Sequence, residues 1–297
     1  MNSKISNKIK RIAEDIARYL DFEQFIIYGG TAVDLLNNKP VNDYDIAIKL
    51  GGKKSIIKLR NLLKNRGFTI IEPWREYTIH KNKKVILIYA ENKEYFLDIA
   101  FLKDFTLIGN YDIESVYISY PEMRIVDKYH GLKNLNIKRI NLIREIESEN
   151  PYVLLGRFIY LCAKYDISLS YKKHRNMLIN LKRKCEKYRS KSAYFNRQVI
   201  PSFYSHVFKA ICKSGNKLKF IGVLIEIEVF DKTFPSLKEA LTKIIENKDL
   251  TDKLLEIGDK QKLINFLITC LEKTDRMDFL KEITKLKIRK WENFNAS

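Results

Sequence analysis

A glycine pair followed by a short helical segment and then two aspartates constrains this chain more than any other feature. An apolar run at residues 25–28 is closed by Gly29-Gly30, and residues 31–36 can continue as a helix. After a turn signal, the sequence reads Asp43-Tyr44-Asp45. The pattern predicts a strand, a tight turn, a helix, a loop and a second strand, in that order.

The two aspartates have the spacing of a metal-binding pair. Side chains two residues apart on a strand point the same way, so Asp43 and Asp45 share one side of the strand and Tyr44 takes the other. Carboxylate oxygens suit Mg²⁺ or Mn²⁺, and two such ions stabilise the attacking and leaving oxygens of an in-line displacement. Asp98, an acid inside an apolar strand, is the predicted third ligand; a buried Lys or Arg is the other partner that such an acid would accept.

The glycine pair suits a triphosphate. Gly29 and Gly30 place no Cβ in the way of a phosphate, and the helix N-terminus behind them favours negative charge. The Thr31 hydroxyl either contacts the nucleotide or caps the helix. Taken alone, a Gly-Gly pair is usually just a tight turn, and an isolated D-x-D is usually a solvated strand end. The strand, glycine pair, helix, loop and D-x-D in this order favour a nucleoside triphosphate site instead.

These residues resemble the DNA polymerase β-like nucleotidyltransferase superfamily, and within it the class II CCA-adding enzymes and bacterial poly(A) polymerases. Residues 103–106 look like the family's Arg-Asp-Phe-Thr, and residues 125–135 look like its I-V-D-P-F-G-G-L-x-D-L segment. The resemblance implies template-independent transfer of a nucleoside monophosphate, most plausibly AMP from ATP, to the 3′ end of an RNA. Mg²⁺ or Mn²⁺ would be the cofactor.

The resemblance continues, less closely, into a neck helix. Residues 149–165 are similar to the family's neck, in which an Asp and an Arg read the incoming base. Asn150 stands in place of that Asp, and Val153 or Leu154 stands in place of that Arg. We expect Asn150 and Arg157 of the neck to meet the base or sugar.

Apolar periodicity predicts an α+β chain. Helical spacing covers residues 5–20, and strand patterns follow at 44–50, 68–71, 85–90 and 95–102. From about residue 142 the pattern is helical throughout. We therefore expect a nucleotidyltransferase head at residues 1–145, with a mixed β-sheet and helices on one face, followed by a mainly helical neck and basic body at residues 146–297.

The charge balance points to a polyanionic partner. Lys and Arg number 55 against 36 Asp and Glu, a formal charge of +19, which favours nucleic acid over the weaker alternative of an anionic membrane. No stretch is long and apolar enough for a membrane span, which favours a cytoplasmic protein. The predicted partner is an RNA 3′ end, with tRNA among the candidates, held by a basic face that includes Lys172, Lys173, Arg175, Lys182, Arg183 and Lys184.

Two other functions fit the same residues. The segment Gly29–Ala32 also resembles the matching segment of nucleotidyltransferase toxins of bacterial abortive-infection systems. In that case, the acceptor would be a tRNA or a protein hydroxyl. A degenerate relative that only binds RNA is the non-enzymatic alternative. The intact Asp43 and Asp45 argue against it, because without metal they would repel a polyanion.

Overall fold

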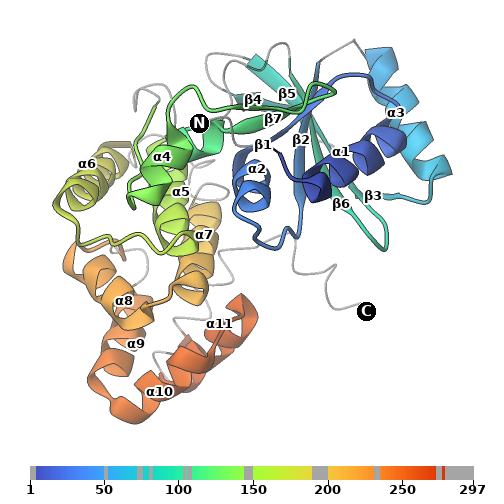
Figure 1. The fold of residues 1–297 in the computed structure, drawn as a ribbon. Coiled ribbons are helices and arrows are strands. Elements are labelled where there is room, and N and C mark those ends of the chain that lie inside the picture. Colours follow the sequence, from blue (N-terminus) through green and yellow to red (C-terminus); the bar gives the residue numbers. More distant parts are fainter. Residues whose placement is uncertain are drawn as a thin grey trace. The chain divides into compact units, whose positions relative to one another are not determined.

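A computed structural model describes residues 5–49, 53–71, 76–79, 83–102, 105, 109–143, 150–188, 200–230, 235–271 and 276–277. The chain divides into two compact units, residues 1–148 and 149–297, drawn in Figure 1. The first unit holds the sheet and the second is helical. Within the described residues, no helix combines the length and apolar character needed to cross a membrane.

The first unit is built on a mixed eight-stranded sheet, as predicted. Seven strands follow the order β3-β5-β6-β2-β1-β7-β8, and β4 pairs with β5. Strands β2 and β6 run parallel, and the other described pairs are antiparallel. The strands are β1 (Phe25–Tyr28), β2 (Tyr44–Lys49), β3 (Thr69–Ile71), β4 (Glu76–Ile79), β5 (Lys83–Glu91), β6 (Phe96–Leu102), β7 (Tyr117–Tyr120) and β8 (Arg124–Val126).

Short helices accompany this sheet. They are α1 (Asn7–Leu20), α2 (Gly29–Leu36), α3 (Lys53–Asn65), the 3₁₀ helix η1 (Asp112–Ser115) and α4 (Gly131–Asn136). Helix α1 begins where the Ser6 side chain accepts a hydrogen bond from the Ile9 amide, and it ends at Asp21 in the left-handed conformation. Its buried residues, Ile9, Ala13, Ile16 and Leu20, recur at helical spacing. Burial of this stripe holds α1 to the unit, at roughly 1.5–3 kcal/mol for each large side chain.

An aromatic contact shows which face of the sheet α1 covers. Tyr44 alternates with Asp43 and Asp45, so its ring lies on the face opposite the acids. That ring packs against Tyr95, with centroids 5.4 Å apart, and the Tyr95 hydroxyl donates to Oδ2 of Asp15 in α1 at 3.2 Å. Helix α3 packs on α1. The predicted arrangement of helices on one face is thus confirmed, and it is the face away from the acids.

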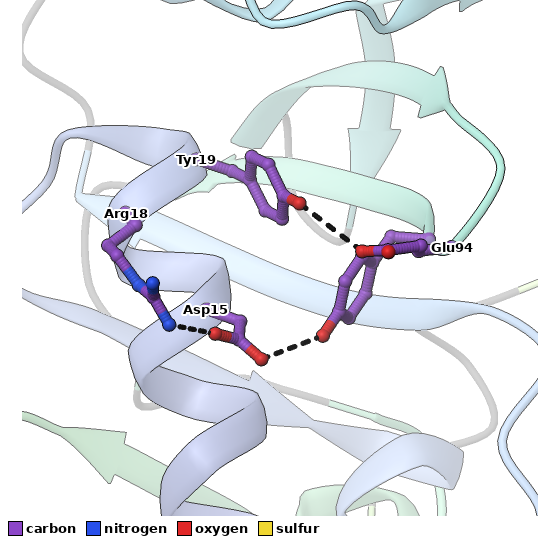
Figure 2. A network of polar contacts seen from close by, with 5 residues as sticks. Asp15, Arg18, Tyr19 and Glu94 are labelled. Atoms are coloured by element: carbon purple, nitrogen blue, oxygen red, sulfur yellow. Dashed lines mark hydrogen bonds and ion pairs between the residues drawn. The ribbon is translucent and has the colours of Figure 1, made fainter.

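Figure 2 shows the polar network that joins α1 to the turn before β6. The Tyr19 hydroxyl donates to Oε2 of Glu94 at 3.4 Å, and Arg18 forms an ion pair with Asp15. A surface hollow of about 400 Å³ lies beside these residues and Arg66. This hollow is therefore at α1, behind the sheet, and not at the predicted catalytic residues.

The second unit consists of helices, as predicted for the neck and body. They are α5 (Pro151–Lys164), α6 (Lys172–Tyr188), α7 (Ile200–Lys213), α8 (Lys217–Glu226), α9 (Pro235–Glu246), α10 (Lys248–Glu256) and α11 (Lys260–Thr269). Helices α5 and α7 pack closely at Gly156, where a Cβ would lie 3.1 Å from the Phe203 ring. Buried apolar side chains such as Phe158 and Phe208 fill the core.

A buried lysine ties two of these helices together. Lys217 opens α8, and its Nζ donates to the carbonyl oxygens of Leu254, Leu255 and Ile257 at 3.2, 2.6 and 2.7 Å. These carbonyls belong to the C-terminal end of α10, where the last carbonyls of a helix lack intrahelical donors; the Leu254 carbonyl also accepts from the Ile257 amide at 3.2 Å. The ammonium group therefore caps α10 from a neighbouring helix.

Candidate active site

The structure brings two of the three predicted acids, Asp45 and Asp98, together on one face of the sheet. Asp45 and Asp98 are Cα partners in the parallel β2–β6 pair, so their side chains emerge side by side from strands about 4.8 Å apart. Asp43 lies in the bend that precedes β2, two residues before Asp45, and is exposed. The register of β2 and β6 thus places Asp98 beside Asp45, although the two residues are 53 positions apart in the sequence.

Thr31 connects the helix that follows the glycines to this pair. Its hydroxyl donates to the Asp43 carbonyl oxygen at 2.9 Å and lies within donor reach of Oδ2 of Asp45 at 3.2 Å. The same oxygen accepts from the Asp45 amide at 2.9 Å. The N-cap of α2 is Tyr28, so capping is not the role of Thr31. Its side chain, 3% exposed, is used to hold the strand that carries the acids.

Gly29 is required for its backbone conformation. Helix α2 begins at this residue, whose φ of +62° is one that side-chain-bearing residues rarely adopt. Its amide donates to the Val116 carbonyl at 3.1 Å and is therefore committed within the protein. Gly30 and Thr31 follow in the first helical turn, whose amides have no intrahelical acceptor and favour an anion.

The chemistry of the acids fits a divalent metal ion bound together with a substrate. Asp43, Asp45 and Asp98 offer hard carboxylate oxygens, but among the described residues no three His, Cys, Asp or Glu side chains are gathered closely enough to hold an ion by themselves. Mg²⁺ is usually bound by one or two carboxylates, with water and substrate phosphates completing the shell. The acids suit that incomplete kind of site.

A buried carboxylate supports the turn next to α2. Asp112 of η1 is 1% exposed and accepts four hydrogen bonds: from the Ile113 and Asn141 amides and from the side chains of Asn134 and Asn141. Burial raises the pKa of the Asp112 carboxyl, and these donors act in the opposite direction. Because η1 contacts α2, this cluster helps to hold the glycine turn in place.

The segment at 125–135, which resembles a family motif, has a structural explanation here. Asp127 accepts from the amides of Gly131 and Leu132 at 2.6 and 3.1 Å, which satisfies the first turn of α4. A Cβ at Gly131 would lie 2.5 Å from the Asp112 carbonyl oxygen, so only glycine allows this approach. Of the Lys-Asp-Phe-Thr segment, Phe105 alone is among the described residues.

The predicted base-contacting residues lie in the second unit. Asn150 is the N-cap of α5, and its Oδ1 accepts from the Tyr152 amide at 3.0 Å. Arg157, about two turns further along, holds its guanidinium 5.5 Å from the centre of the Tyr160 ring. A contact of either residue with a nucleotide stays a prediction.

The predicted basic face falls on α6, and the structure divides it. Arg175 pairs with Glu226 at 2.6 Å, and Lys182 pairs with Glu228 at 3.2 Å. Three of the other predicted cations are exposed and Lys184 is half-buried; the exposed ones are Lys172, Lys173 and Arg183. Residues 189–199, the rest of the basic stretch, lie outside the described residues.

The fold that holds these acids has known counterparts. No protein-family model matches the chain, and no curated protein sequence matches it. Among solved structures, the chain is similar to a CCA-adding enzyme complexed with CTP, with a TM-score of 0.59, 17% identity, and coverage of 94% of this chain and 66% of that one. It is also similar to the Thermotoga maritima CCA-adding enzyme complexed with tRNA, with a TM-score of 0.60, 16% identity, and coverage of 97% and 68%.

A third similar structure is a tRNA-processing enzyme in an apo form, with a TM-score of 0.60, 16% identity, and coverage of 98% and 79%. The chain therefore has an α+β fold with a sheet-containing head and a helical body. That fold is the one found in CCA-adding enzymes, as the sequence motifs led us to expect, and the chain spans 66% of the length of the first of these structures.

Proposed function

We propose that this protein is a metal-dependent nucleotidyltransferase that adds a nucleoside monophosphate, most plausibly AMP from ATP, to the 3′-hydroxyl of an RNA. The observation that carries the proposal is the pairing of Asp45 with Asp98 across β2 and β6, with Asp43 held just before β2 by Thr31, beside a helix that begins at a left-handed glycine. Similarity to structures described as complexes with CTP, ATP and tRNA supports it.

In the proposed reaction, the 3′-oxygen of the RNA forms a bond to the α-phosphorus of the nucleotide. The bond between the α-phosphorus and the α,β-bridging oxygen breaks, pyrophosphate leaves, and the hydroxyl proton passes to a carboxylate or to water. The chain's own contribution is positioning and charge. Asp43 and Asp45 would hold Mg²⁺, with Asp98 assisting, and a bound Mg²⁺ would neutralise charge on the phosphates.

Other residues would bind the substrates. Gly30 and the amides of the first turn of α2 would meet the triphosphate, and Thr31 would keep Asp43 and Asp45 aligned. Asn150 and Arg157 would meet the base or sugar from α5. The net charge of +19 favours association with RNA.

The test is incubation of the purified protein with Mg²⁺, total RNA and each labelled nucleoside triphosphate in turn, read on a denaturing gel. We expect label in RNA, strongest with ATP, and none with Asp43→Ala/Asp45→Ala. Glu122→Ala, which removes an exposed acid from the β7–β8 turn, is the matched control and should keep full activity. Label in protein in place of RNA would favour the toxin-like function, and no label from any nucleotide would overturn the proposal.

A further inference from the structure

Helix α6 separates its cations onto two sides. Arg175 and Lys182, seven residues apart and therefore on one side of the helix, are bound to Glu226 and Glu228. Glu186, the only acid of the helix, joins the same side through Lys182 at 3.4 Å. These cations have partners within the protein, and their role is to hold α6 to the end of α8.

A second side of α6 carries what we call the basic stripe: Lys172, Asn176, Asn180, Arg183 and Lys187. Its residues recur at spacings of four, four, three and four, which is one continuous helical row, and all five are exposed. Among the described residues, no ion pair involves Lys172, Arg183 or Lys187.

The stripe faces away from the core of the unit. The buried positions of α6 are His174, Leu178, Leu181 and Cys185, which lie on the opposite side of the helix. From Lys172 to Lys187 the stripe spans about 22 Å at the helical rise per residue. It is therefore long enough to follow several nucleotides of a strand.

An aromatic side chain stands at one end of the stripe. Tyr171, immediately before α6, is 44% exposed, and its ring meets His174 edge-on with centroids 5.2 Å apart. Tyr171 thus packs on one side against the buried His174, and the exposed part of its ring is a surface on which an unpaired base can stack.

We propose that the basic stripe and Tyr171 bind the backbone of a single-stranded segment of RNA. Cations attract phosphates, the amides of Asn176 and Asn180 donate to phosphate or sugar oxygens, and no acid interrupts the row. A lipid surface would instead require apolar residues beside the cations, and the stripe has amides at those positions. The inference rests on the proposed function for the identity of the partner, and it corrects the predicted basic face by removing Arg175 and Lys182 from it.

Two double variants of equal charge test the inference. Arg183→Gln/Lys187→Gln removes two cations from the stripe, and Arg175→Gln/Lys182→Gln removes two from the ion-paired side of the same helix. Binding of a short fluorescein-labelled single-stranded RNA is measured by anisotropy over a range of salt concentrations, with thermal unfolding to show that each variant is folded. We expect the stripe variant to lower the slope of log K against log salt by about 1.4, or 0.7 per lost phosphate contact, and the matched variant to keep the wild-type slope.

Tyr171 is tested with its own pair of variants. Tyr171→Ala should weaken binding on the order of tenfold and Tyr171→Phe should not, because the ring supplies the stacking. Equal slopes for the two double variants, or tighter binding of a duplex than of the single strand, would overturn the inference. A wild-type protein that binds no RNA would remove the proposed RNA acceptor as well, whereas RNA bound equally by both double variants would remove only the stripe.

Discussion

Thr31 and Asp45 are joined through a single oxygen: the Thr31 hydroxyl accepts from the Asp45 amide at 2.9 Å and lies 3.2 Å from Oδ2 of the Asp45 carboxylate. The same hydroxyl reaches the Asp43 carbonyl at 2.9 Å. A hydroxyl has one proton to donate, so it serves one of the two acceptors at a time. In either case, the first turn of α2 and the start of β2 are held as one piece.

Replacement of Thr31 should therefore damage the site more than the fold. Thr31→Val keeps the shape but removes the hydroxyl, and we expect kcat to fall by up to about 100-fold through misplacement of Asp45, with KM for the nucleotide little changed. Thr31→Ser restores the hydroxyl and should recover most of the activity. Steady-state kinetics of both variants decide the matter, and a Thr31→Val enzyme with wild-type kcat would show that the hydroxyl is not needed.

Asp98 should act with Asp45 through a metal ion. Asp98→Asn keeps the size of the side chain and removes its charge, so we expect a loss of more than about tenfold in activity and a higher Mg²⁺ concentration for half-maximal rate. Glu91→Gln is the control, because Glu91 is an exposed acid of the neighbouring strand β5, two residues from the Tyr89 that pairs with Asp98. An equal response of the two variants to Mg²⁺ would count against a ligand role for Asp98.

The buried Asp112 predicts a pH dependence of stability. Burial raises the pKa of its carboxyl in the folded protein, so the folded state holds the proton more tightly than the unfolded state does. The free energy of unfolding should therefore fall as the pH rises above about 4, the ordinary carboxyl range, until the raised pKa has been passed. The Asp112 carboxyl therefore contributes most to the free energy of unfolding at pH values below this range.

Asp112→Asn isolates this contribution, because the other acids are common to both proteins. The difference in unfolding free energy between wild type and variant, measured by urea titration at several pH values, should shrink as the pH rises. A difference that grows with pH would mean that the four hydrogen bonds outweigh burial and lower the pKa. Titration of the Asp112 carboxyl by NMR provides an independent check.

Lys217 should be essential for the stability of the second unit. Lys217→Met keeps the apolar stem but removes the ammonium donor from the carbonyls of Leu255 and Ile257, whereas the Leu254 carbonyl keeps the Ile257 amide. Unsatisfied buried acceptors cost about 1–3 kcal/mol each at most, and we expect the variant to lose roughly 2 kcal/mol or more in denaturant unfolding. Lys219→Met, which changes an exposed lysine of the same helix, should lose almost nothing.

Local patterns were sufficient to predict the fold class and the strand that carries Asp45. The period-2 alternation of residues 44–48 indicates this strand, because successive side chains of a strand point to opposite faces. The apolar surroundings of Asp98 mark it as an acid that needs a partner. By contrast, strands β7 and β8 have four and three residues, too few for a periodic pattern; β7 forms by pairing with β1, and β8 by pairing with β7.

Other features depend on contacts between distant parts of the chain. Thr31 looks like a helix cap or a phosphate ligand in the sequence, and its partner on β2 becomes evident only from the fold. The ion pairs of Arg175 and Lys182 with Glu226 and Glu228 could not be predicted either, because the partners lie more than 40 residues away in the sequence. Sequence charge alone does not distinguish a cation that binds a ligand from one that is already paired.

The contact between Tyr44 and Tyr95 has a consequence for how function can be lost. Tyr44 sits between the two acids in the chain, yet its ring is fastened behind the sheet, to a residue that Asp15 of α1 holds in turn. Strand β2 is thus supported by contacts on the face opposite the acids, and this support does not occupy the face on which we expect the substrate. A random screen for inactive proteins should accordingly recover changes in α1, far from any substrate, alongside those at the acids themselves.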